Sequence, residues 1–115
     1  MLTLPIKKKW FDMILSGKKK EEYREIKPYW DTRFETWLEI PKGEMDFFFR
    51  DVLKHNKIPM PVLPILFRNG YSKESPSFIA KCTLSIGTGK EEWGAEKGKE
   101  YFILTVQEIL KGSED

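Results

Sequence analysis

Apolar and polar residues alternate with the period of two that is typical of β-strands along residues 2–6, 78–86 and 101–110. The clearest of these runs has an apolar residue at every second position from Phe78 to Ile86. Residues 62–67 are almost all apolar, which favours a strand buried on both faces. Pro5 places the first strand at a sheet edge or makes it short, because proline lacks an N–H group for the ladder.

Apolar residues recur at helical spacing in two further segments. One face comprises Trp10, Phe11, Ile14 and Leu15, and the other comprises Trp30, Phe34, Trp37 and Leu38. Core packing is the favoured interpretation of Trp10 and Phe11. Pro28 fits the first turn of the second helix, whereas Thr32 and Glu35 fit a capping box, so the pattern leaves its start open.

Residues 40–61 have the least regular pattern, with Pro41 and Gly43 near one end and two prolines at the other. A short helix is expected between Met45 and Asn56, burying Phe48, Val52 and Leu53. We interpret this segment as an insertion that covers one end of the fold. After it, the strand patterns resume and continue to residue 110.

A charged stretch joins the first helix to a second strand. Gly17 favours the end of the helix, because glycine adopts the left-handed conformation there at little cost. In a strand that begins near Lys20, residues Lys20, Glu22 and Arg24 share one face. Lys19 lies in the turn and can reach the same space. These charges can orient an anionic or amide-bearing ligand, or they can form a solvated edge whose ion pairs contribute about 0–1 kcal/mol each.

The spacing of Gly17, Lys19, Glu22 and Arg24 matches G-x-K-x-x-E-x-R, the signature of the ASCH domain family, and the order of predicted elements also resembles that family. The resemblance implies an α+β fold, a single domain over residues 1–115. It implies a small PUA-like β-barrel of about five to six strands with two or three flanking helices. A cleft beside the motif is then expected to bind RNA or a nucleotide-like ligand.

The resemblance places Gly17, Lys19, Glu22 and Arg24 at that cleft. Lys19 and Arg24 are expected to hold phosphate oxygens, Arg24 in a bidentate manner. Glu22 is expected to accept a hydrogen bond from a base or to position a water. Tyr29 and Trp30 follow the motif strand, and either ring lines the cleft mouth to stack on a base or packs in the core.

Two alternatives remain open. Some bacterial relatives of this family hydrolyse the acetyl amide of N4-acetylcytidine with a threonine where this chain has Glu22, and ribonuclease activity is also associated with the family. In a hydrolase, Glu22 would act as general base while Lys19 and Arg24 stabilise the oxyanion. A second carboxylate would come from one of Glu91, Glu92 and Glu96. The other alternative is a protein-interaction module.

Composition narrows the picture. A chain of 115 residues with 40% hydrophobic residues is expected to be one globular domain. The single cysteine, Cys82, lies at one of the alternating apolar positions of its strand and is expected to be buried. The chain has one cysteine and one histidine, His55, to which no role is assigned, so the two cannot make a zinc site of the usual kind.

No cofactor, metal or membrane partner is expected, and the default is a soluble cytoplasmic protein. Gly87–Gly89 is expected to be a loop, not a dinucleotide fingerprint. The net charge is +2, with the positive excess in residues 1–30.

Overall fold

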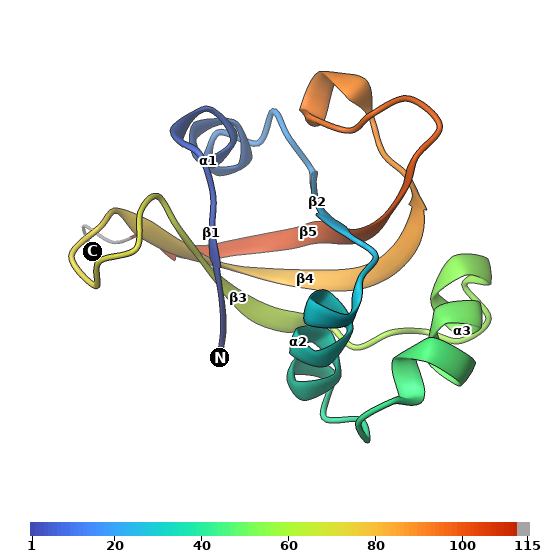
Figure 1. Cartoon of the computed structure of the whole chain (residues 1–115). Helices are drawn as coiled ribbons and strands as arrows, with labels where there is room; N and C mark the ends of the chain where they lie inside the picture. Colours follow the sequence, from blue (N-terminus) through green and yellow to red (C-terminus); the bar gives the residue numbers. More distant parts are fainter. Residues whose placement is uncertain (113–115) are drawn as a thin grey trace.

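In the computed structural model, which describes residues 1–112, five strands form one curled sheet in the spatial order β1-β3-β4-β5-β2 (Figure 1). In chain order they are β1 (Leu2–Pro5), β2 (Glu21–Glu25), β3 (Leu63–Arg68), β4 (Ser77–Thr88) and β5 (Glu100–Gly112). Strand β1 pairs with β3 in parallel, and the other pairs are antiparallel. The sheet is therefore a half-barrel whose edge strands are β1 and β2.

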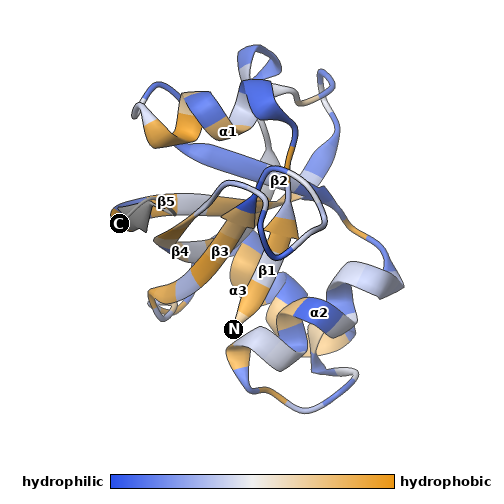
Figure 2. Cartoon of the chain, turned by 90° about the vertical axis from the view of Figure 1, so that its left-hand side faces the viewer, coloured by the Kyte–Doolittle hydropathy of each residue, from blue (hydrophilic) through white to orange (hydrophobic). Residues whose placement is uncertain are grey.

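Three helices accompany the sheet: α1 (Lys8–Leu15), α2 (Pro28–Leu38) and α3 (Arg50–His55). Two views show α1 above the strands and α2 with α3 below them (Figures 1 and 2). A π-helical turn, Met45–Phe49, leads into α3, and a short 3-10 turn, Glu91–Trp93, lies between β4 and β5. The fold class is thus α+β with a barrel-like sheet. No helix within residues 1–112 combines the length and the apolarity that crossing a membrane requires.

The core fills the inside of the curl. In β4, every second residue from Phe78 to Ile86 is buried, as the alternation predicted. The ring of Phe11 from α1 meets the ring of Phe78 edge-on at 4.9 Å between centroids. On the other side of the core, Phe34 of α2 meets Phe102 of β5 at 5.0 Å. Aromatic contacts therefore fix both helices to the core face of the sheet. Figure 2 shows hydrophobic residues along β1 and β3 of this sheet, in orange.

The start of α2 is settled by Pro28, which occupies the first turn. The capping-box prediction for Thr32 and Glu35 is wrong, because Glu35 lies well inside the helix and is 4% exposed. Its carboxylate instead accepts hydrogen bonds from the backbone N–H groups of Gly43 and Met45 at 2.8 and 3.0 Å. This buried carboxylate fixes the start of the middle segment to α2.

In that middle segment, Val52 and Leu53 are buried as predicted, but the burial of Phe48 was predicted wrongly. Phe48 is 60% exposed, and Met45 is fully buried in its place. The reason is the π-helical turn, which has more residues per turn than an α-helix and so rotates its side chains to other directions.

Two smaller corrections concern the ends of elements. Leu15 was assigned to the buried face of α1, but it is the last residue of that helix and 42% exposed. Gly87 and Thr88 belong to β4 and not to a loop, because β5 continues the pairing as far as Thr88 and Glu100. The connection between the two strands therefore begins at Gly89.

Candidate ligand-binding cleft

The end of α1 determines where the motif charges lie. Gly17 adopts a φ of +84°, the left-handed conformation predicted for it, and the chain turns back so that the Lys19 N–H donates to the Met13 carbonyl at 2.9 Å. This turn directs the Lys19 side chain inward, toward the face of β2 that carries Glu22. Both residues are buried, Lys19 at 1% and Glu22 at 5% exposure.

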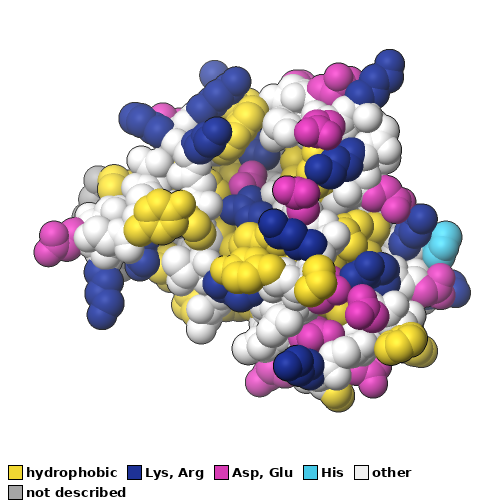
Figure 3. Space-filling view, in the orientation of Figure 1, with side chains coloured by type: hydrophobic (Ala, Val, Ile, Leu, Met, Phe, Trp, Pro, Cys, Tyr) yellow, Lys and Arg dark blue, Asp and Glu magenta, His cyan; other side chains and the backbone are white. Residues whose placement is uncertain are grey.

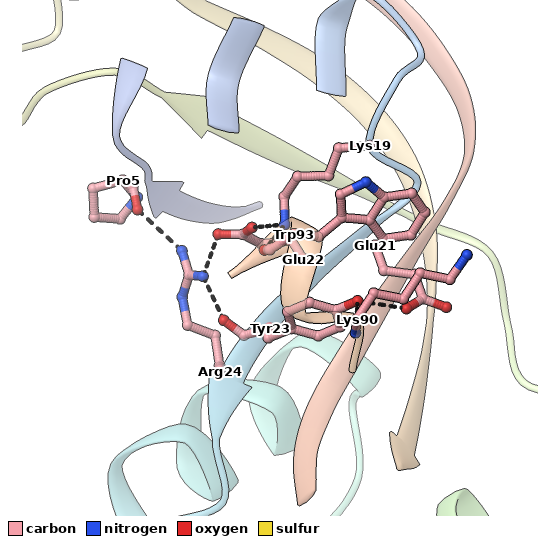
Figure 4. A network of polar contacts seen from close by, with 8 residues as sticks. All are labelled: Pro5, Lys19, Glu21, Glu22, Tyr23, Arg24, Lys90 and Trp93. Carbon is pink, nitrogen blue, oxygen red and sulfur yellow. Dashed lines mark hydrogen bonds and ion pairs between the residues drawn. The ribbon is translucent and has the colours of Figure 1, made fainter. Parts of the chain in front are cut away.

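Lys19 lies in a cage of acceptors and rings. Its Nζ is 2.9 Å from Glu22 Oε1 and donates a hydrogen bond to the Trp93 carbonyl, also at 2.9 Å (Figure 4). The ring centres of Trp10 and Tyr23 are each 4.9 Å from this nitrogen. Burial lowers the pKa of Lys19 below its usual value, and the Glu22 carboxylate opposes that shift.

Arg24 connects the two edge strands of the half-barrel. Its guanidinium forms an ion pair with Glu22 Oε2 and donates hydrogen bonds to the Tyr23 carbonyl of β2 at 2.8 Å and to the Pro5 carbonyl of β1 at 3.0 Å. Figure 4 shows these three bonds fanning out from one side chain. An edge strand has no partner strand on its outer side, so the carbonyls that face outward find no backbone N–H there. Arg24 supplies the donors that a sixth strand would otherwise provide.

Tyr29 and Trp30 lie beside this junction, outside the lining of the cleft. Arg24 and Arg33 stack over the Trp30 ring at 5.4 and 5.8 Å, and Arg33 also donates to the Thr3 carbonyl at 3.2 Å. Trp30 is partly buried against the core, whereas Tyr29 is 56% exposed and accepts a hydrogen bond from Arg33 at 2.9 Å. The structure therefore groups these two rings with the edge of β1.

A cleft of about 270 Å³ opens between the start of α1, β2 and the turn at Trp93. Its lining residues are Pro5, Ile6, Lys7, Trp10, Glu22, Tyr23, Arg24, Trp93 and Gly94. Figure 3 shows a notch between α1 and the loop after β4, with basic and acidic side chains on its floor. The volume falls just below the range of about 300–1,000 Å³ for sites that hold drug-sized molecules, so one base-sized ring fits.

The loop that forms one wall is closely packed on the motif strand. The Lys90 N–H donates to the Tyr23 hydroxyl at 2.9 Å, and this hydroxyl donates to Glu21 Oε1 at 2.7 Å. A Cβ on Gly89 would lie 2.6 Å from the Tyr23 ring, and one on Gly94 would lie 3.0 Å from Trp10. Only glycine permits both approaches.

The prediction that Trp10 belongs to the core is wrong, because Trp10 is only half-buried and forms part of the cleft wall. Trp93 and Gly94 were not predicted to line the site at all. The one sequence signal for this wall is the pair Gly89 and Gly94 flanking an aromatic residue, which marks close backbone approach but not the element approached.

None of Glu91, Glu92 and Glu96 hydrogen-bonds or ion-pairs with Lys19, Glu22 or Arg24 among the described residues, and all three are exposed. The loop contributes a backbone carbonyl, not a carboxylate, to the cluster. At the opposite rim, Lys7 and Lys9 are exposed, and the first turn of α1 has neither an acidic residue nor a side-chain cap. The potential on the α1 side of the cleft is therefore positive.

Within residues 1–112, no three His, Cys, Asp or Glu side chains are grouped to hold a metal ion. Comparison of the chain with protein-family models, with curated proteins and with solved structures gives no match. The ASCH-like assignment thus stays a prediction that depends on the motif and on the order of elements.

Proposed function

We propose that this chain is an ASCH-like domain, with a PUA-like barrel, that binds one base of an RNA strand or of a nucleotide in the cleft. The observation that carries the proposal is the buried Glu22 carboxylate, held between Lys19 and Arg24 on the floor of a cleft that admits a single ring. Such a floor presents fixed acceptors and donors together, which is how an edge of a base is recognised.

Glu22 and Arg24, on the floor of the cleft, can each form further hydrogen bonds with a ligand. Each Glu22 oxygen has one cationic partner and can accept a further bond, for example from an exocyclic amino group. Arg24 has five N–H donors and uses three of them within the chain. Aromatic walls add stacking, which contributes about 1–3 kcal/mol per base and suits any base.

Binding is favoured over hydrolysis for three reasons. Glu22 stands where the hydrolases of this family have threonine, and both of its oxygens already pair with cations of the chain, so neither is free to take the proton of a water as a general base. No carboxylate of the loop after β4 reaches the cluster within the described residues. The observation in favour of the hydrolase is the lowered pKa of Lys19, since catalytic lysines have that property.

The test is calorimetric titration at low salt with nucleosides including N4-acetylcytidine, their monophosphates and a short single-stranded RNA. Trp10→Leu is expected to weaken binding roughly 5- to 150-fold, the equivalent of one stacking contact. Tyr71→Leu is the matched control, because Tyr71 is 89% exposed and outside the cleft.

The same samples are analysed for product by chromatography. Binding without product supports the binding domain, whereas Lys19-dependent turnover would establish the hydrolase in its place. If none of these ligands binds at low salt, the nucleic-acid proposal is wrong, and a protein-interaction module becomes the better interpretation.

A further inference from the structure

The two cations expected to hold phosphate are already engaged inside the protein. The Lys19 side chain is 0% exposed, with Glu22, a backbone carbonyl and two aromatic rings around its ammonium group. The Arg24 side chain is 15% exposed and bonds to both edge strands. A phosphate group that displaced these contacts would leave buried polar groups unpaired, which is costly. A phosphate is therefore better held outside this cluster, and the two N–H donors that Arg24 has left are assigned to the base.

Two lysines at the α1 rim are placed for that role. Lys7 is exposed and lines the cleft directly. Lys9 is exposed, and its Nζ lies 4.7 Å from the ring centre of Trp10, which forms the adjacent wall. Among residues 1–112 neither lysine forms an ion pair, whereas their neighbour Lys8 pairs with Asp12 at 2.7 Å. Lys7 and Lys9 thus remain available to an anion at the mouth.

The opposite rim is less suitable for an anion. Lys90 does stack on Trp93, with its Nζ 4.5 Å from the ring centre. It is followed directly by Glu91 and Glu92, both exposed. These two carboxylates offset the single lysine, so a phosphate is repelled from the loop and attracted to α1.

We propose that Lys7 and Lys9 form a phosphate subsite, so that the ligand enters with its base in the cleft and a phosphate on the α1 rim. This inference rests on the proposed function and deepens it. It assigns base recognition to the floor and phosphate binding to the rim, and it makes the ligand a phosphorylated nucleoside rather than a neutral one. Lysine suits this role because its flexible stem follows a phosphate without a fixed orientation.

The experiment compares each nucleoside with its 5′- and 3′-monophosphate and with a six-nucleotide RNA, by calorimetry at several salt concentrations. We expect the phosphorylated ligands to bind roughly tenfold more tightly than the nucleosides, which corresponds to about 1.4 kcal/mol. K7A/K9A is expected to remove this difference, so that it weakens the binding of the monophosphates about tenfold more than the binding of the nucleosides. For the RNA, the slope of log affinity against log salt should become shallower by about 1.4, or about 0.7 per lysine.

Lys8→Ala is the matched control, because it removes one charge from the same turn but from a residue already paired. An effect of K7A/K9A on monophosphates identifies a free nucleotide as the phosphate source, and an effect confined to the strand identifies RNA. The subsite is refuted, and the proposed function kept, if phosphorylated and neutral ligands bind equally or if Lys8→Ala weakens binding as much as K7A/K9A. If no ligand binds at all, both proposals are refuted.

Discussion

Replacing Glu22 with glutamine removes the one negative charge between two cations. In the wild-type protein, Glu22 Oε1 lies 2.9 Å from Nζ of Lys19, whose side chain is fully buried, and Glu22 Oε2 pairs with Arg24. Without the carboxylate, Lys19 must stay charged with only a carbonyl and two rings as partners, or lose its proton. Breaking a buried pair in this way lowers the free energy of unfolding by about 3–5 kcal/mol.

The opposite single change is expected to be milder. Lys19→Met keeps a side chain of similar length, and Glu22 keeps its pairing with Arg24. The loss is mainly the hydrogen bond to the Trp93 carbonyl, which is about 1–3 kcal/mol when a buried acceptor stays unsatisfied. K19M/E22Q should be less destabilised than the sum of the single variants, because removing Lys19 also removes the unpaired charge that Glu22→Gln creates.

The assay is urea denaturation at pH 7, followed by tryptophan fluorescence and by far-ultraviolet circular dichroism. Glu21→Gln is the matched control: it neutralises the neighbouring residue of β2, keeps an acceptor for the Tyr23 hydroxyl, and should change stability by less than about 0.5 kcal/mol. The reasoning is refuted if Glu22→Gln costs no more than Glu21→Gln, if Lys19→Met is the more damaging change, or if the two effects simply add.

The pH dependence gives an independent readout. Because burial lowers the folded-state pKa of Lys19 below 10.5, the unfolded chain binds more protons between the two values, and stability rises with pH across that window. Lys19→Met should abolish this rise. Burial also raises the pKa of Tyr23 above 10.0, which makes stability fall as pH rises beyond that value, so the comparison belongs below pH 10.

Three further outcomes follow from single side chains. Arg24→Lys should lower the free energy of unfolding by about 1–3 kcal/mol in the same urea assay, because an ammonium cannot serve Glu22 and the carbonyls of both edge strands with guanidinium geometry; equal stability would contradict its connecting role. Burial raises the pKa of Cys82 to about 12, so a thiol reagent should react with it only on unfolding. The contribution of Cys82 to stability is fully present below pH 9.0 and is lost as pH rises from there, so the loss of stability in alkali should be smaller in Cys82→Ala than in the wild type. Met45→Ala should cost about 2–5 kcal/mol, while Phe48→Ala should stay within about 0.5 kcal/mol; the reverse order would refute the π-helical turn.

The parts of the fold that the sequence predicts are those governed by local geometry. The alternation from Phe78 to Ile86 predicted the buried face of β4, because strand side chains repeat every two residues whatever the sheet around them. The position of Gly17 predicted a left-handed helix end for a similar reason. The proximity of Lys19, Glu22 and Arg24 was predicted because all three lie within one turn and one strand.

The parts that the sequence does not predict depend on partners distant in the chain. The carbonyl that Lys19 bonds belongs to Trp93, 74 residues away, and any residue type offers a carbonyl. The hydrogen bond from Arg24 to the Pro5 carbonyl could not be predicted from the sequence either, because it forms only when the curl of the sheet brings the two edge strands together. The burial of Met45 in place of Phe48 depends on a π-helical turn, for which the apolar pattern has no distinct period.

These contacts change how the motif is to be tested for function. A ligand that recognises the cleft floor meets the same charges that hold β1 to β2, so Lys19→Ala or Arg24→Ala weakens the fold together with any binding. Loss of binding in such a variant therefore does not by itself demonstrate contact with a ligand. Lys7 and Lys9 are exposed and unpaired within the described residues, so their removal leaves the core untouched. A binding defect in K7A/K9A at unchanged stability is thus the more direct evidence that a phosphate lies at this cleft.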